Sequence, residues 1–158
     1  MIRGIGTDIV NIARIEAVIL RYGERFLQRI FTSHERDYCD GAQGQRRIIR
    51  YANRYAAKEA CLKAIGVKHG ISWQHIEVQN AANGKPYLRL YGAAHQAAHE
   101  AVNVEENIAG GQVANVASDN IDVAEGIIAR AGGQGRDYRL HLSLSDDYPY
   151  ATAFVVLE

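Results

Sequence analysis

The segment Arg54–Gly66 constrains this chain more than any other stretch of its sequence. It is rich in Ala, Leu, Lys and Glu, which lose little conformational freedom in a helix, and Gly66 can end that helix. Glu59 and Lys63 are four residues apart, so they emerge on one helical face, one turn from each other. The segment therefore predicts a helix that carries a carboxylate among cations.

Such a helix has two interpretations. Arg54 and Lys58 form a second pair on a neighbouring line, so the carboxylate of Glu59 is surrounded by positive charge. This arrangement can hold a divalent metal beside a polyphosphate, because the metal needs oxygen ligands and the phosphates need positive charge. The alternative is a solvated helix whose salt bridges each contribute a few tenths of a kcal/mol. The segment by itself favours the solvated helix.

Composition limits the classes of partner. The chain has 158 residues, enough for one domain with its own core, and 18 basic residues balance 18 acidic ones. The chain therefore has no net charge that would attract nucleic acid or a membrane surface. Two cysteines without a disulfide framework or a CxxC site indicate a reducing compartment. Because no apolar run approaches the ~20 residues that span a bilayer and no signal peptide is evident, we expect a cytoplasmic protein.

The first half of the chain predicts a strand followed by helices. Ile2–Val10 has the pattern of a short strand that is broken by glycines and carries Asp8 near its end. Asn11 is a good cap for a helix in which apolar residues recur at helical spacing, and Gly23 interrupts that helix. Thr32–Glu35 has the composition of a capping box, which predicts the start of another helix.

The second half predicts two antiparallel hairpins. His75–Gln79 and Pro86–Tyr91 alternate polar and apolar residues, and the Asn-Gly pair between them is a strong hairpin signal. Leu140–Ser145 also alternates, which places His141 and two serines on one sheet face, and a turn precedes Ala151–Leu157.

Residues 103–136 have a different character. They follow a predicted Ala-rich helix over Ala93–Val102, contain paired glycines, and show one candidate helix around Val123–Ala131. We expect an inserted loop at about 103–136 within a single domain that spans residues 1–158.

Several ionisable residues could together carry chemistry on a pyrophosphate. Asp8 and Glu59 come from separate elements and could jointly bind Mg²⁺, which takes its other ligands from water and substrate phosphate. Lys63 could hold a phosphate, and either Glu59 through a water molecule or His141 could assist proton removal. Taken separately, Asp8 is more often a turn or cap residue, and His141 more often an ordinary sheet histidine.

Two further groups are candidates for binding. The turn Gly84-Lys85-Pro86 could present an amide and an ammonium to a nucleotide phosphate, although hairpin chemistry explains it equally. Three arginines could form a docking stripe for an acidic partner or an ordinary exposed face: Arg14, Arg21 and Arg25. The chain lacks a Walker phosphate loop, a zinc HExxH motif and a Gly-x-Ser-x-Gly elbow, which argues against several common enzyme classes.

Four blocks together resemble the holo-[acyl-carrier-protein] synthase family of 4′-phosphopantetheinyl transferases. They are Gly4–Glu16, Arg54–Gly66, Asn83–Pro86 and His141–Ser145, and they occur in the family's order. The combination of the GTDIV and KEAxxKA motifs is a specific sign of this family, whereas the GKP motif alone is weak evidence. The combination outweighs the separate interpretations above.

The resemblance implies transfer of the 4′-phosphopantetheine arm of coenzyme A to a serine of apo acyl carrier protein, with release of adenosine 3′,5′-bisphosphate. It also implies an α+β fold in which an antiparallel sheet wraps around a long helix. The family usually assembles as a homotrimer with active sites at subunit boundaries.

The resemblance assigns roles by position. The Mg²⁺ ligands match Asp8 and Glu59. The positions against the coenzyme A phosphates match Lys63 and His141, and the catalytic group comprises Glu59, Lys63 and His141. The positions that line the nucleotide site match Arg46, Arg54, Gly84, Lys85 and Pro86. The positions that meet the acidic carrier protein match Arg14 and Arg25, with Arg21 nearby.

Some alternatives stay open at this point. A metal-held water, or Glu59 acting through water, is favoured as the proton acceptor for the carrier serine, and His141 is the rival. A non-catalytic carrier-protein-binding module and a Mg²⁺-dependent nucleotide pyrophosphatase are the alternative functions.

Overall fold

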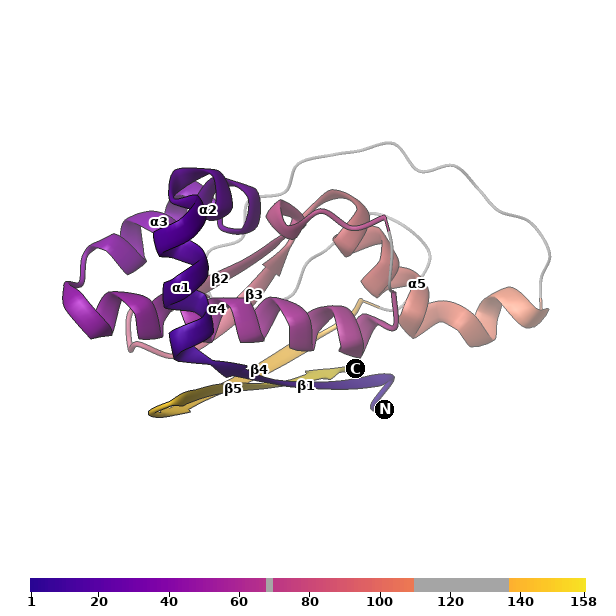
Figure 1. Cartoon of the computed structure of the whole chain (residues 1–158). Helices are drawn as coiled ribbons and strands as arrows, with labels where there is room; N and C mark the ends of the chain where they lie inside the picture. Colours follow the sequence, from indigo (N-terminus) through magenta and orange to yellow (C-terminus); the bar gives the residue numbers. More distant parts are fainter. Residues whose placement is uncertain (68–69, 110–136) are drawn as a thin grey trace.

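The computed structural model describes residues 1–67, 70–109 and 137–158. Its elements run in the order β1, α1, α2, α3, α4, η1, β2, β3, α5, β4 and β5 (Figure 1). The long helix α4 (Gly44–Ile65) packs against an antiparallel three-stranded sheet and also against an antiparallel hairpin. This arrangement confirms the α+β fold predicted from the sequence.

The three-stranded sheet has the order β1-β5-β4. Its strands are β1 (Gly4–Asn11), β4 (Leu140–Asp147) and β5 (Tyr150–Leu157). The first and last strands of the chain pair directly, with Gly4 opposite Leu157, and β5 also forms the predicted C-terminal hairpin with β4. β1 begins two residues later than predicted and extends one residue further.

The glycines of β1 allow it to lie directly on α4. A Cβ added to Gly6 would lie 1.8 Å from the carbonyl oxygen of Ala60, and one added to Gly4 would lie 1.8 Å from that of Ala64. Any side chain at these two positions would force the strand away from the helix. The close approach brings the following residue of the same strand face, Asp8, beside α4.

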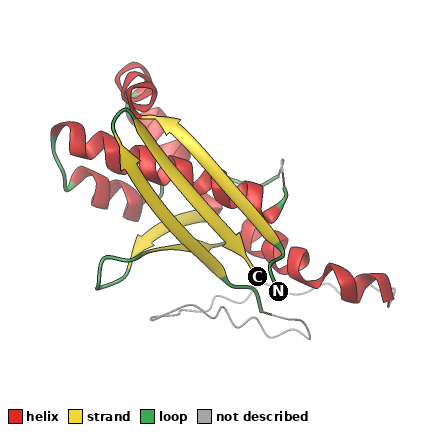
Figure 2. Cartoon of the chain, turned by 90° about the horizontal axis from the view of Figure 1, so that it is seen from below, coloured by secondary structure: helices red, strands yellow, loops and turns green. Residues whose placement is uncertain are grey.

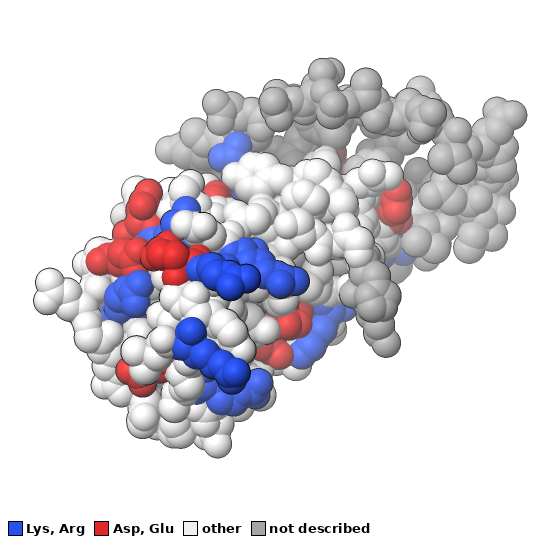
Figure 3. All heavy atoms as spheres, turned by 45° about the horizontal axis from the view of Figure 1, so that its top comes forward, with Lys and Arg blue, Asp and Glu red and all other residues white. Residues whose placement is uncertain are grey.

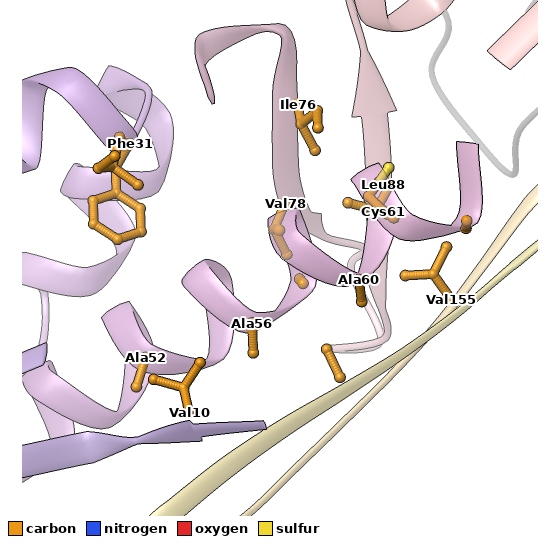
Figure 4. Packing of buried hydrophobic residues seen from close by; sticks show 14 of the residues in the cluster. Val10, Phe31, Ala52, Ala56, Ala60, Cys61, Ile76, Val78, Leu88 and Val155 are labelled. Carbon is orange, nitrogen blue, oxygen red and sulfur yellow. The ribbon is translucent and has the colours of Figure 1, made fainter. Parts of the chain in front are cut away.

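Small residues on α4 make this packing possible. Ala52, Ala56 and Ala60 are fully buried along one side of the helix, where Val10 of β1 and Val155 of β5 meet them (Figure 4). On another side, Cys61 is buried together with apolar residues of the β2–β3 hairpin: Ile76, Val78 and Leu88. The helix is therefore the centre of the core rather than a solvated surface helix.

Three short helices connect β1 to α4. They are α1 (Ile12–Tyr22), α2 (Glu24–Ile30) and α3 (Ser33–Asp40). The predicted cap is confirmed, because Asn11 Oδ1 accepts hydrogen bonds from the backbone N–H groups of Ala13 and Arg14. Gly23 separates α1 from α2 at a positive φ of 52°, as predicted. The capping box that starts α3 is likewise present.

A buried ion pair joins α3 to α4. Lys58 Nζ lies 2.7 Å from Glu35 Oε2, and both side chains are 0% exposed. Lys58 Nζ also donates to the carbonyl oxygens of Ile30, Trp73 and Ile76. Burial lowers the pKa of Lys58, and the charge of Glu35 opposes this effect. The pair therefore ties five elements together: α2, α3, α4, η1 and β2.

A short hairpin and one more helix complete the described fold. The 3₁₀ turn η1 (Trp73–His75) precedes β2 (Ile76–Asn80) and β3 (Pro86–Leu90), the predicted hairpin. The helix α5 (Gly92–Ala109) is longer than the predicted Ala93–Val102 and enters the range predicted as a loop. The candidate helix around 123–131 lies outside the described residues.

The outer face of the three-stranded sheet is open. The three strands lie in front of the helices when the molecule is seen from below (Figure 2). Ile5, Ile9 and Phe154 point outward from it and are 55%, 64% and 46% exposed. No helix among the described residues is long and apolar enough to cross a membrane.

Candidate functional site

Asp8 and Lys63 meet where β1 crosses α4. Lys63 Nζ lies 2.8 Å from Asp8 Oδ1 and 2.8 Å from the carbonyl oxygen of Thr7. The Asp8 carboxylate is largely covered, whereas the Lys63 side chain is half exposed. The sequence predicted that both residues belong to one site, and the structure brings them into contact.

Glu59 belongs to the same cluster. Tyr55, Glu59 and Lys63 follow one another at four-residue spacing on α4, so they lie on one helical face. The Tyr55 hydroxyl donates to Glu59 Oε1 over 3.4 Å. Burial raises the pKa of Tyr55, and the charges of Glu59 and Asp8 raise it further. Both carboxylates therefore act on the same hydroxyl group.

Asp8, Tyr55, Glu59 and Lys63 together form what we call the carboxylate cluster, and its two carboxylates, Asp8 and Glu59, fit a magnesium ion. Magnesium is usually held by one or two protein carboxylates, several waters and substrate phosphates. No group of three or more His, Cys, Asp or Glu side chains that could hold a metal occurs in the described part of the chain. A metal at Asp8 and Glu59 would therefore draw its remaining ligands from water and substrate.

A second cluster surrounds Arg54, and we call it the arginine cluster. Arg54 is only 3% exposed, and its guanidinium carbon lies 4.0 Å from the ring centroid of Tyr38. Its Nη2 donates to Asn80 Oδ1 over 2.8 Å, and Asn80 Nδ2 in turn donates to the carbonyl oxygen of Gly84. The structure thus links Arg54 to the predicted Gly84-Lys85-Pro86 turn through Asn80.

Arg50 extends this cluster along the helix. Arg46, Arg50 and Arg54 are four residues apart and share one face of α4. Arg50 stacks on Tyr38, with 4.4 Å between guanidinium carbon and ring centroid, and its Nη1 donates to the Tyr38 carbonyl oxygen. Arg46 is exposed, as is Lys85 on the hairpin. Arg54 has a buried Nε without a hydrogen-bond partner among the described residues.

His141 lies apart from both clusters. It points to the outer face of the sheet, opposite Val156, whereas α4 covers the inner face. Its Nε2 lies 3.0 Å from Glu158 Oε1, and this hydrogen bond lowers the pKa of Glu158. The sheet separates His141 from Asp8 and Glu59 of the same chain, because alternate strand residues point to opposite faces.

The three arginines of the predicted docking stripe are all exposed. Arg14 and Arg21 lie on α1, and Arg25 lies on α2. Arg14 also lies close enough to Tyr55 for its charge to act on the Tyr55 hydroxyl, which places this end of α1 beside the carboxylate cluster. Charged side chains of both signs gather over the half of the molecule that contains α1 to α3 (Figure 3).

Sequence reasoning missed several residues of these clusters. Tyr55 had a usable signal, since it precedes Glu59 by one helical turn. Tyr38 and Asn80 had none, because their contacts with Arg54 join segments that are far apart in the chain.

Comparisons with known proteins identify the family of this chain. The family model described as "4′-phosphopantetheinyl transferase superfamily" matches residues 4–117. A holo-[acyl-carrier-protein] synthase of Paramagnetospirillum magneticum is 41% identical over 158 residues, which cover 100% of this chain and 97% of that protein. Residues 103–136 fall within this alignment.

Solved structures agree in fold. A Bacillus anthracis holo-(acyl-carrier-protein) synthase in complex with CoA (3′,5′-ADP) is 30% identical, with a TM-score of 0.65 and coverage of 99% of this chain and 96% of that one. The Neisseria meningitidis holo-[acyl-carrier-protein] synthase is also 30% identical, with a TM-score of 0.65 and coverage of 100% and 99%. The chain therefore belongs to the holo-[acyl-carrier-protein] synthase family of the 4′-phosphopantetheinyl transferase superfamily.

Proposed function

We propose that this protein transfers the 4′-phosphopantetheine arm of coenzyme A to a serine of apo acyl carrier protein. The names of its relatives and the coenzyme A complex of the Bacillus anthracis structure support this activity. The main observation behind the proposal is that Lys63 contacts Asp8 of β1. Lys63 lies one helical turn from Glu59 on α4, so the contact brings the three residues together. This cluster combines two carboxylates with an ammonium, which suits a metal and a phosphate.

The reaction requires mainly positioning and charge neutralisation. The serine oxygen attacks the β-phosphorus of the coenzyme A pyrophosphate, the bond to the bridging oxygen breaks, and adenosine 3′,5′-bisphosphate leaves. Asp8 and Glu59 would hold Mg²⁺, which supplies positive charge against the pyrophosphate when bound. Lys63 would contact a phosphate, and Glu59 would accept the serine proton through a water molecule.

The arginine cluster supports binding of the nucleotide end of coenzyme A. Arg46 shares one face of α4 with the buried Arg54, Lys85 belongs to the turn that Asn80 links to Arg54, and both cations are exposed. The Nε of Arg54 has no hydrogen-bond partner among the described residues. A phosphate at this place would receive charge-assisted hydrogen bonds. Gly84 and Pro86 would shape the turn against the nucleotide.

A mass measurement tests the activity directly. The protein is incubated with coenzyme A, Mg²⁺ and apo acyl carrier protein, and the carrier should gain the mass of phosphopantetheine. Carrier binding without a mass gain would instead support a non-catalytic carrier-binding module. Cleavage of coenzyme A in the absence of any carrier would support a nucleotide pyrophosphatase.

We further propose that the protein acts as a homotrimer. The exposed apolar side chains of the sheet support this, since Ile5 and Ile9 of β1 and Phe154 of the adjacent β5 point outward, where a second copy could cover them. His141 lies on the same face, away from its own chain's Asp8 and Glu59. In a trimer, the His141 of one subunit could complete the site of its neighbour.

Mixing two inactive variants tests this shared site. We expect Glu59→Gln and His141→Ala to be inactive alone and to regain activity after their subunits exchange, because about a quarter of the mixed sites then combine two intact residues. Activity is measured after dilution from mild denaturant, with each variant treated alone as the control. Absence of any regained activity in verified mixed trimers would contradict a site shared between subunits.

The arginines of α1 and α2 are proposed to dock the acidic carrier protein. We expect Arg14→Glu with Arg25→Glu to raise KM for the carrier about tenfold or more, because exposed charges control encounter and orientation. KM for coenzyme A should change less. The matched control replaces both residues by Lys, which keeps the charge; equal carrier KM in the Glu and Lys variants would remove these positions from docking.

The remaining proposals concern organisation and location. We propose that residues 1–158 form one domain, which agrees with relatives that align over the whole chain. We also propose that the protein is cytoplasmic. Support comes from Cys39 and Cys61, which are both free and buried, and burial raises the pKa of each thiol to about 12.

A further inference from the structure

We propose that the Tyr55 hydroxyl positions the Glu59 carboxylate, so that one oxygen of Glu59 is held by the protein while the other remains available to a metal. This inference rests on the proposed function, because the orientation of Glu59 matters only if that residue binds a metal or accepts a proton. It names Tyr55 as a positioning residue rather than a catalytic one.

The two carboxylates of the cluster are held in the same way. Lys63 Nζ contacts Asp8 Oδ1 over 2.8 Å, and the Tyr55 hydroxyl contacts Glu59 Oε1 over 3.4 Å. Among the described residues, neither Asp8 Oδ2 nor Glu59 Oε2 accepts a hydrogen bond. Each acid therefore presents one occupied oxygen and one free oxygen, and both restraints come from α4.

The Tyr55 ring is fixed by stacking. It lies on the Trp73 ring with 5.2 Å between centroids and 25° between ring planes. Because a tyrosine side chain has few rotatable bonds, a fixed ring also fixes the direction of its hydroxyl group. The hydroxyl is thereby directed at Glu59, one helical turn further along α4.

The backbone of Trp73 is held by a hydrogen bond from the buried Lys58. The Trp73 carbonyl oxygen accepts a hydrogen bond from Lys58 Nζ over 2.9 Å, and Lys58 is held by the buried Glu35. The adjacent Gln74 donates to the carbonyl oxygens of Gln28 and Phe31. The stacking surface is thus attached to α2 and α4, and through Lys58 to Glu35 of α3, which keeps the Tyr55 ring in place.

The hydrogen bond from Tyr55 to Glu59 is long in this structure. A separation of 3.4 Å is longer than an ideal O–H···O hydrogen bond. Hydrogen bonds of catalytic groups are often long before ligands bind and tighten afterwards. A hydroxyl that donates to a carboxylate forms a charge-assisted bond, which is stronger than a neutral one.

The test replaces Tyr55 by Phe, which keeps the stacked ring and removes only the hydroxyl. With Mn²⁺ alone as the probe, we expect the Kd of Tyr55→Phe, measured by the paramagnetic resonance of free Mn²⁺, to rise about tenfold. Transfer activity at low Mg²⁺ should fall similarly and recover as Mg²⁺ is raised. The matched control is Tyr91→Phe, which removes a hydroxyl that donates to Glu77 Oε1 over 3.1 Å, and it should bind Mn²⁺ like the wild type.

The outcomes separate this inference from the proposed function. Wild-type Mn²⁺ affinity and wild-type metal dependence of transfer in Tyr55→Phe would overturn the positioning role, even if the wild type is fully active. A wild-type protein that neither transfers phosphopantetheine nor binds Mn²⁺ would count against the proposed function instead. Trp73→Leu keeps the hydroxyl but loses the stacking surface, so it should also weaken Mn²⁺ binding; unchanged affinity there would contradict the role of the stack.

Discussion

Replacement of Lys58 by Met is expected to lower the free energy of unfolding by about 3–5 kcal/mol. The substitution leaves the Glu35 carboxylate buried without its cation, since both side chains are 0% exposed. It also removes the hydrogen-bond donor of three carbonyl oxygens, on Ile30, Trp73 and Ile76, and the first and last of these bonds are buried. The loss should appear in chemical denaturation and as a drop in Tm of about 10 °C.

The control for this prediction is Lys63→Met on the same helix. Lys63 is half exposed, and its ion pair with Asp8 lies near the solvent. Exposed pairs contribute about 1 kcal/mol or less, so this variant should unfold close to the wild type while losing transfer activity. A Lys58→Met protein that is as stable as Lys63→Met would show that the buried pair does not stabilise the fold.

Replacement of Glu59 by Gln is expected to reduce transfer activity about a thousandfold. The amide keeps the size of the side chain and can still accept the hydrogen bond of Tyr55, but it carries no negative charge. It should therefore bind Mg²⁺ poorly and fail as a proton acceptor. The rate is measured as the gain of phosphopantetheine mass on the carrier protein.

Stability separates a chemical effect from unfolding in this variant. Glu59 is only partly buried and has one long hydrogen bond, so the Tm of Glu59→Gln should stay near that of the wild type. Glu100→Gln is the matched control, because Glu100 is exposed on α5 and contacts only the nearby Gln96 among the described residues. Wild-type turnover in Glu59→Gln would exclude Glu59 from the mechanism.

Local sequence signals predicted most of the elements. The caps at Asn11 and Thr32, the break at Gly23 and both hairpins occur where the sequence placed them. These features depend on residues within a few positions of one another, so they can be identified without the fold. The helix α5 was predicted too short, because its C-terminal part lacks the strong pattern of its first turns.

The central helix was only partly predicted. The sequence predicted that Glu59 and Lys63 are neighbours on one helical face, and the structure confirms that both lie in the helix α4. It did not distinguish the exposed Lys63 from the buried Lys58, because both are lysines in the same helical segment. Burial depends on which elements pack around each face, and here α2, α3, η1 and β2 surround Lys58.

The sequence by itself determined the local structure of this protein, its family and the residue types of its site. The fold alone decided that Asp8 meets Lys63, that Tyr55 reaches Glu59, and that His141 lies on the opposite face of the sheet. The physical reason is that spacing along a helix or strand fixes only the relative direction of side chains on that element. Contacts between elements depend on how the elements pack, which here follows from the close approach of β1 to α4 at Gly4 and Gly6.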